Sequence, residues 1–166
     1  VRVRNLTYQQ PFSPVLVVAH TRDVALFKEG FPASDEIKLM AEDGDNSGLL
    51  ALAGSDAVAP FICGAVVGEG PVFPGETWRG SFSIDEHACP DAVYSVVTML
   101  STEANNELCS HIPGPACPAD SGNMQDGPGE GFIHVHRGFH GINEGGLTAV
   151  GYDWRNPVAE VFVDRV

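Results

Sequence analysis

Hydrophobic and polar residues alternate along several short parts of the chain, as they do in strands that bury one face. The clearest example is F-I-H-V-H at residues 132–136, and the first residues, V-R-V-R-N-L-T, follow the same rule. Other parts are continuously apolar or rich in β-branched and aromatic side chains. Strands are therefore predicted at residues 1–7, 16–19 with His20 at its end, 77–84, 94–100, 132–136 and 158–163.

Turn-forming residues recur between these segments. The chain has 19 Gly and 12 Pro among 166 residues, which is typical of many short strands and unlike a helical protein. We expect an all-β fold, an antiparallel β-sandwich of about eight strands, in a single domain over residues 1–166. Residues 105–131 are rich in Pro, Gly, Asp and Asn and predict a long irregular loop.

One segment carries the signals of a short helix. It has an N-cap, two acidic residues in the first turn, an apolar stripe at helical spacing and a glycine that ends it. In chain order these are Ser34; Asp35 and Glu36; Ile37, Met40 and Ala41; and Gly44. The stripe indicates a buried face, so Met40 is interpreted as core and not as a metal ligand.

The composition of the chain argues against several classes of protein. Lys and Arg number 9 against 22 Asp and Glu, a net charge of −13, which disfavours nucleic acid as a partner. A hydrophobic content of 43% excludes general disorder. The chain contains no apolar run near the ~18 residues of a membrane span.

Four cysteines suggest an oxidising compartment. Cys109 and Cys117 bracket an irregular loop that a disulfide would hold, which leaves Cys63 to pair with Cys89. Three pairings are formally open, and four reduced thiols are the alternative. The chain begins at Val1 without a leader, as a secreted or periplasmic protein does after signal-peptide removal. Residues 5–7, N-L-T, have the form of an N-glycosylation sequon.

Seven motifs occur in an order that resembles the N-terminal spondin domain family, particularly its bacterial members. They are V-R-V-R-N-L-T-Y-Q-Q-P-F-S-P at the start, A-H at 19–20, F-x-x-G-F-P-A-S-D-E-I at 27–37, A-E-D-G at 41–44, I-P-G-P at 112–115, G-F-I-H-V-H-R-G-F-H-G at 131–141 and Y-D-W-R-N-P-V-A at 152–159. The resemblance implies a secreted, non-catalytic antiparallel β-sandwich whose first and last strands lie close. In animal members it implies calcium binding and adhesion to cell surfaces or matrix.

The calcium site of the family does not carry over. Bacterial relatives usually have an N-T-N-D-A-F segment and an acidic stretch after this strand, whereas here Met99 and Leu100 run directly into S-T-E-A-N at 101–105. A separate calcium candidate is Asp43 with Asp45 in D-G-D-N-S-G, but the position of the bidentate Glu of an EF-hand is Gly54. The alternative for these residues is the turn that follows the helix.

The main candidates for metal ligands in the sequence are histidines. If residues 132–136 form a strand, His134 and His136 project from one face and Ile133 and Val135 face the core. Two imidazoles side by side can bind one transition-metal ion. His140 or His20 would supply a third ligand. Imidazole ligands favour copper, with zinc as the alternative, over calcium. The competing interpretation is that these histidines are structural and hydrogen-bond backbone carbonyls or acidic side chains.

No sequence motif of a hydrolase, zinc protease or nucleotide-binding enzyme is present. We therefore expect a secreted or periplasmic, non-catalytic protein that binds copper for uptake, storage or delivery. The alternative is an extracellular adhesion module that contacts glycan or protein, with structural histidines. Metal-dependent catalysis, the metal's identity and oxidation state, the oligomeric state and the physiological partner stay open.

Overall fold

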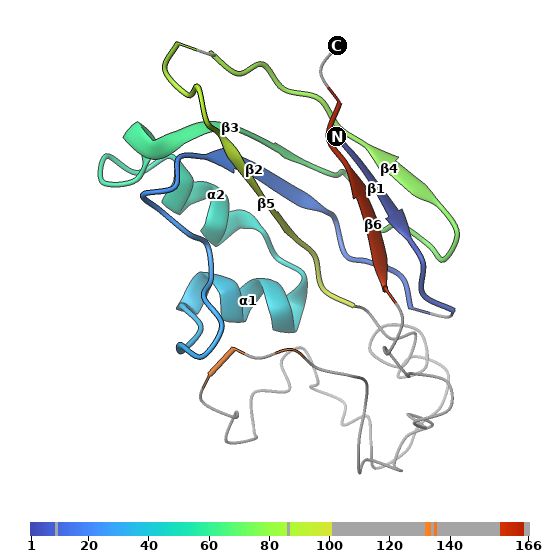
Figure 1. Ribbon diagram of the computed structural model, residues 1–166. Coiled ribbons are helices and arrows are strands. Elements are labelled where there is room, and N and C mark those ends of the chain that lie inside the picture. Colours follow the sequence, from blue (N-terminus) through green and yellow to red (C-terminus); the bar gives the residue numbers. More distant parts are fainter. Residues whose placement is uncertain (9, 86, 101–131, 134, 136–156, 165–166) are drawn as a thin grey trace.

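The computed structural model describes residues 1–8, 10–85, 87–100, 132, 133, 135 and 157–164 (Figure 1). Within them the chain forms short strands, two α-helices and one 3₁₀ turn. The elements are β1 (Arg2–Asn5), β2 (Leu16–His20), α1 (Asp35–Asp43), α2 (Ser47–Ala53), η1 (Ala59–Phe61), β3 (Ile62–Val67), β4 (Thr77–Arg79), β5 (Val93–Val97) and β6 (Ala159–Phe162).

The strands form two three-stranded antiparallel sheets. One sheet has the order β4-β1-β6 and the other β3-β2-β5, so β1 and β2 are the central strands. Pairing of β1 with β6 places Val3 opposite Val161 and brings the first and last strands together, as the family resemblance implied. A β-rich antiparallel fold is confirmed, but the described residues contain six strands, not about eight.

Strand β2 is buried along its whole length because both of its faces are covered. Leu16 and Val18 pack with residues of α1 and α2 in one hydrophobic cluster. Val17 packs in a second cluster with Val3 of β1 and, at its margin, Trp78 of β4. Side chains alternate across a strand, so β2 contributes to the helix side and to the other sheet in turn. Figure 1 shows both helices on one side of the β3-β2-β5 sheet.

Helix α1 forms where the sequence predicts it. The Ser34 hydroxyl accepts the Ile37 N–H at 3.3 Å, and Gly44 ends the helix with φ 68°, its N–H donating to the Met40 carbonyl at 2.9 Å. The left-handed conformation favours glycine there. Ile37 and Met40 are buried, which confirms Met40 as core. Ala41 is exposed, so its assignment to the buried stripe was wrong.

Helix α2 was not predicted. Its sequence, S-G-L-L-A-L-A, is too short to show a helical period, although Leu and Ala have high helix propensity. Leu49 anchors it in the cluster below β2, and Asp45 Oδ1 accepts the Ser47 N–H at 2.7 Å at its start. The segment that resembled a calcium loop is therefore the connection between two helices.

Four predicted strands are shorter than expected; β1 and β6 lack one or two of the predicted residues at each end, and two others end three or more residues early. Residues 77–84 form a strand only as far as Arg79. Beyond it, the Phe82 ring packs on β3 at Gly64, so closely that a Cβ on this glycine would be 2.6 Å from the ring. Residues 94–100 form β5 from Val93 to Val97, and Leu100 makes only an isolated bridge to Phe12. Packing of the aromatic ring onto the sheet replaces further strand pairing.

The predicted strand at residues 132–136 is not seen at its described positions. Phe132, Ile133 and Val135 lie outside any strand. Ile133 packs against the cluster below β2, as expected, but Val135 is 75% exposed and does not face the core. Alternation correctly placed Ile133 and wrongly placed Val135, because this segment departs from the two-residue period of a strand.

The disulfide between Cys63 and Cys89 is confirmed. It ties β3 to the segment before β5, and the 26-residue separation means that it restricts a sizeable loop of the unfolded chain. The predicted Cys109–Cys117 pair lies outside the described residues.

Asn5 at the end of β1 is fully buried and joins three segments. Its Nδ2 donates to the carbonyls of Gln10 at 2.8 Å and Val72 at 2.9 Å, while its Oδ1 accepts from the N–H and hydroxyl of Thr7. Both amide hydrogens are thus used inside the protein. The nitrogen that a glycan would modify is inaccessible in the folded domain.

We expect Asn5→Ala to lower the free energy of unfolding by about 3 kcal/mol, because it removes four hydrogen bonds at a buried site. The Gln10 and Val72 carbonyls each keep one donor, the Thr7 hydroxyl and the Phe12 N–H. Asn46→Ala is the matched control: Asn46 is also buried but donates only to the Pro14 carbonyl, at 2.7 Å, so we expect a loss of about 1 kcal/mol. Urea denaturation of both variants measures the difference. Equal losses would contradict the role assigned to Asn5.

Candidate functional site

The segment that carries the paired histidines is attached to the scaffold at Ile133. The Ile133 N–H donates to the Phe31 carbonyl and its carbonyl accepts the Gly30 N–H, each at 2.8 Å. Its side chain packs on the cluster below β2, whereas Phe132 is 52% and Val135 75% exposed. Ile133 is thus attached to the scaffold, while Phe132 before it and Val135 after His134 have exposed side chains.

His134, His136 and His140 themselves lie outside the described residues. Their predicted convergence on a metal ion is therefore still a prediction. In the part of the chain that the structure describes, no group of three or more His, Cys, Asp or Glu side chains is placed to hold a metal ion.

His20 is described, and it is buried, with 4% of its surface exposed. Its Nδ1 lies 2.7 Å from the Thr21 carbonyl oxygen and its Nε2 lies 2.8 Å from the Ser95 hydroxyl. A carbonyl only accepts, so Nδ1 carries a proton, and in the neutral ring Nε2 accepts from Ser95. His20 could act as a third metal ligand only if Ser95 released Nε2.

The acidic candidates at the helix connection serve the local fold. The Ser47 backbone N–H and then the Ser47 side chain, both hydrogen-bonded to the Asp45 carboxylate, lower the pKa of Asp45 below its usual value of 3.8. This is an Asx-type turn that leads into α2. Asp43 is the last residue of α1, just before the Gly44 cap. The geometry fits the interpretation of Asp43 and Asp45 as a turn; calcium binding by them stays a prediction.

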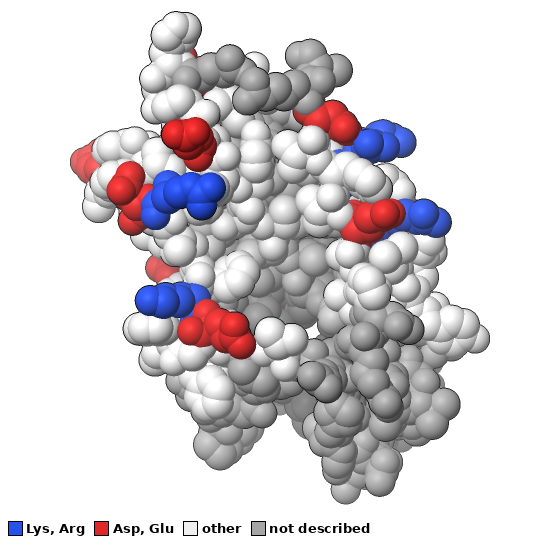
Figure 2. All heavy atoms as spheres, in the orientation of Figure 1, with Lys and Arg blue, Asp and Glu red and all other residues white. Residues whose placement is uncertain are grey.

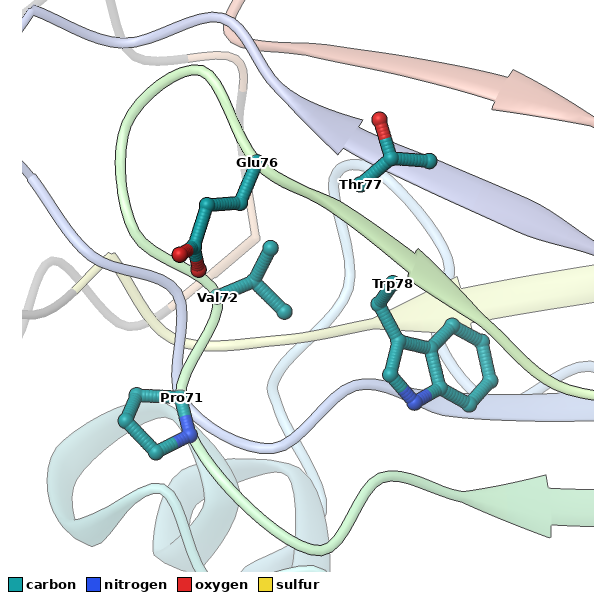
Figure 3. A pocket seen from close by; sticks show the side chains of 5 residues that line it. All are labelled: Pro71, Val72, Glu76, Thr77 and Trp78. Atoms are coloured by element: carbon teal, nitrogen blue, oxygen red, sulfur yellow. The ribbon is translucent and has the colours of Figure 1, made fainter.

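A hollow at the start of β4 was not expected from the sequence. Figure 3 shows its lining residues, Pro71, Val72, Glu76, Thr77 and Trp78, around a volume of about 410 Å³. Trp78 lies in the alternating T-W-R-G-S-F-S-I segment, which was interpreted only as a strand. Because Trp78 is opposite the buried Val3, its ring points inward, and only its edge reaches the hollow.

Charges on the face shown in Figure 2 are scattered. Acidic and basic side chains lie next to one another there, separated by uncharged surface, so this face has no continuous basic patch. Among the described residues, no helix has the length and apolar character to cross a membrane. The chain matches no family model, no curated protein and no solved structure.

We expect the neutral His20 ring to be the Nδ1–H tautomer, because the Thr21 carbonyl requires a donor at that nitrogen. Long-range proton–nitrogen NMR spectra of the imidazole rings distinguish the two tautomers. Ser95→Ala should leave the tautomer unchanged, because the Thr21 contact persists. A proton on Nε2 would contradict the assigned hydrogen bonds.

Asp45→Asn should show how much the charge of the Asp45 carboxylate contributes to the stability of the fold, because asparagine keeps a hydrogen-bond acceptor and loses only the charge. A depressed pKa stabilises the fold above the unfolded value of 3.8, and this stabilisation is lost as pH falls through the lowered pKa. The wild type should therefore exceed the variant in stability near neutral pH, and the difference should shrink below about pH 3.8. Denaturation across a pH series measures it; a constant difference would argue against a charge effect.

Proposed function

We propose that this protein is an extracytoplasmic, non-catalytic metal-binding protein that holds copper through His134 and His136. The closeness of these two histidines in the sequence, with His140 four residues further on, supports the proposal, and so does the anchoring of Ile133. Two main-chain hydrogen bonds and a packed side chain hold the residue next to His134, while the side chains of Phe132 and Val135 are exposed. A segment fixed at one point and open to solvent suits reversible capture of an ion. Zinc is the alternative metal.

The third ligand would be His140 or His20. His140 is three residues beyond Arg137 and separated from the pair by a glycine, so the chain can turn there. His20 is rigidly placed, but its Nε2 is engaged by Ser95. We favour His140, since its use requires no loss of a buried hydrogen bond.

We further propose that the chain is a spondin-type β-sandwich that acts in the periplasm or outside the cell. The ordered motifs support the family, and the pairing of β1 with β6 agrees with what it implies. Val3 of one sheet and Val17 of the other share a hydrophobic cluster, which is the packing a sandwich requires. The Cys63–Cys89 disulfide is compatible with an oxidising compartment.

The proposal is tested by metal analysis of protein purified without an affinity tag. We expect stoichiometric copper or zinc in the wild type and its loss on combined substitution of His134→Ala and His136→Ala. His87→Ala is the control, since His87 is fully exposed and its nearest charged partner is Asp85 at 3.7 Å. Ser95→Ala tests the third ligand: tighter copper binding than wild type would indicate His20, and unchanged binding would indicate His140.

Wild-type protein that stays metal-free throughout a copper titration would overturn the metal proposal. It would favour the alternative, an adhesion module whose histidines are structural. Equal metal loss in the His87→Ala control would show that binding is nonspecific.

A further inference from the structure

The hollow beside β4 combines an apolar wall with two unused polar groups. Pro71, Val72 and the edge of Trp78 form the wall. The Trp78 Nε1–H has no hydrogen-bond partner among the described residues and is not fully buried. The nitrogen lies beside Gly68, 3.0 Å from where a Cβ on that glycine would be, and Figure 3 shows it on the side of the ring nearer Pro71. A volume of about 410 Å³ falls in the range of ~300–1,000 Å³ typical of small-molecule sites.

Glu76 supplies the acceptor. Its Oε2 accepts the Phe73 N–H at 3.0 Å, which fixes the carboxylate at the hollow, and its Oε1 has no partner among the described residues. Figure 3 shows the carboxylate beside Val72, across the hollow from the indole. The site therefore offers one donor and one charged acceptor on opposite sides of an apolar surface.

Charge and chemistry limit the ligand. Among the described residues no Lys or Arg lines the hollow, and Glu69 lies two residues before Pro71. Because the chain also has a net charge of −13, an anionic ligand is disfavoured. An organic cation would suit Glu76 but would leave the indole N–H without an acceptor. A neutral ligand with hydroxyl groups satisfies both, because a hydroxyl donates and accepts.

We propose that this hollow binds a neutral sugar ring, with a hydroxyl donating to Glu76 Oε1, another accepting from Trp78 Nε1, and the C–H face of the ring against the exposed Pro71, beside the buried Val72. None of the described lining residues belongs to the segment that carries His134 and His136, so the proposed carbohydrate binding does not rest on metal binding. Because the hollow is shallow and a hexose is small, we expect a dissociation constant on the order of 1 mM.

The indole N–H groups give a direct readout. The chain has 2 Trp, so a proton–nitrogen spectrum has two indole cross-peaks, which Trp78→Phe assigns, and Trp154 serves as the internal reference. We expect titration with methyl glucoside, methyl galactoside, methyl mannoside or N-acetylglucosamine to shift the Trp78 peak to saturation in the millimolar range. Glucuronate and choline, the anionic and cationic probes, should leave it in place.

Glu76→Gln tests the acceptor with little risk to folding, because the amide oxygen still accepts from Phe73 and only Oε1 is replaced by a donor. It should weaken binding about tenfold or more. Glu29→Gln, an exposed glutamate away from the hollow, should bind as the wild type does. The proposal is overturned if no neutral sugar shifts the Trp78 peak, if choline or glucuronate shifts it equally, or if Glu76→Gln binds unchanged.

Discussion

Burial of β2 on both faces is the constraint on which the rest of the described structure depends. Leu16 and Val18 face the helices, and Val17 faces the second sheet, so a single strand belongs to both hydrophobic clusters. Burying one such side chain contributes about 1.5–3 kcal/mol. The two sheets and two helices are therefore held against one strand, and His20 at its end is buried with it.

Close contacts hold the outer segments to this centre. Phe82 packs where Gly64 has no side chain, and the Cys63–Cys89 disulfide lies one residue away on β3, so the crossover between β4 and β5 is fixed at two adjacent points. At the other sheet, Asn5 binds the carbonyls of two separate segments. Buried hydrogen bonds and the disulfide therefore add to the stability that a small hydrophobic core provides.

The scaffold presents two different surfaces. Near Ile133, main-chain hydrogen bonds attach the histidine-bearing segment to the loop before α1, with apolar side chains exposed on either side. At the start of β4, Glu76 and Trp78 border a hollow. These two surfaces rest on different elements and share no described residue, so the proposed metal site and the proposed sugar site can be tested separately.

Patterns of local origin were readable from the sequence. The α1 caps at Ser34 and Gly44, the apolar β2 and the terminal strands follow from side chains and their neighbours within a few residues. The Cys63–Cys89 pair was one of three possible pairings, favoured because Cys109 and Cys117 flank an irregular loop, and the structure contains it. Only tertiary packing decided where those patterns end. Strand β4 stops at Arg79 because Phe82 packs on Gly64. Val135 is exposed although it alternates with Ile133. Likewise, the contact between His20 and Ser95 joins residues far apart in the chain, and no local period encodes it.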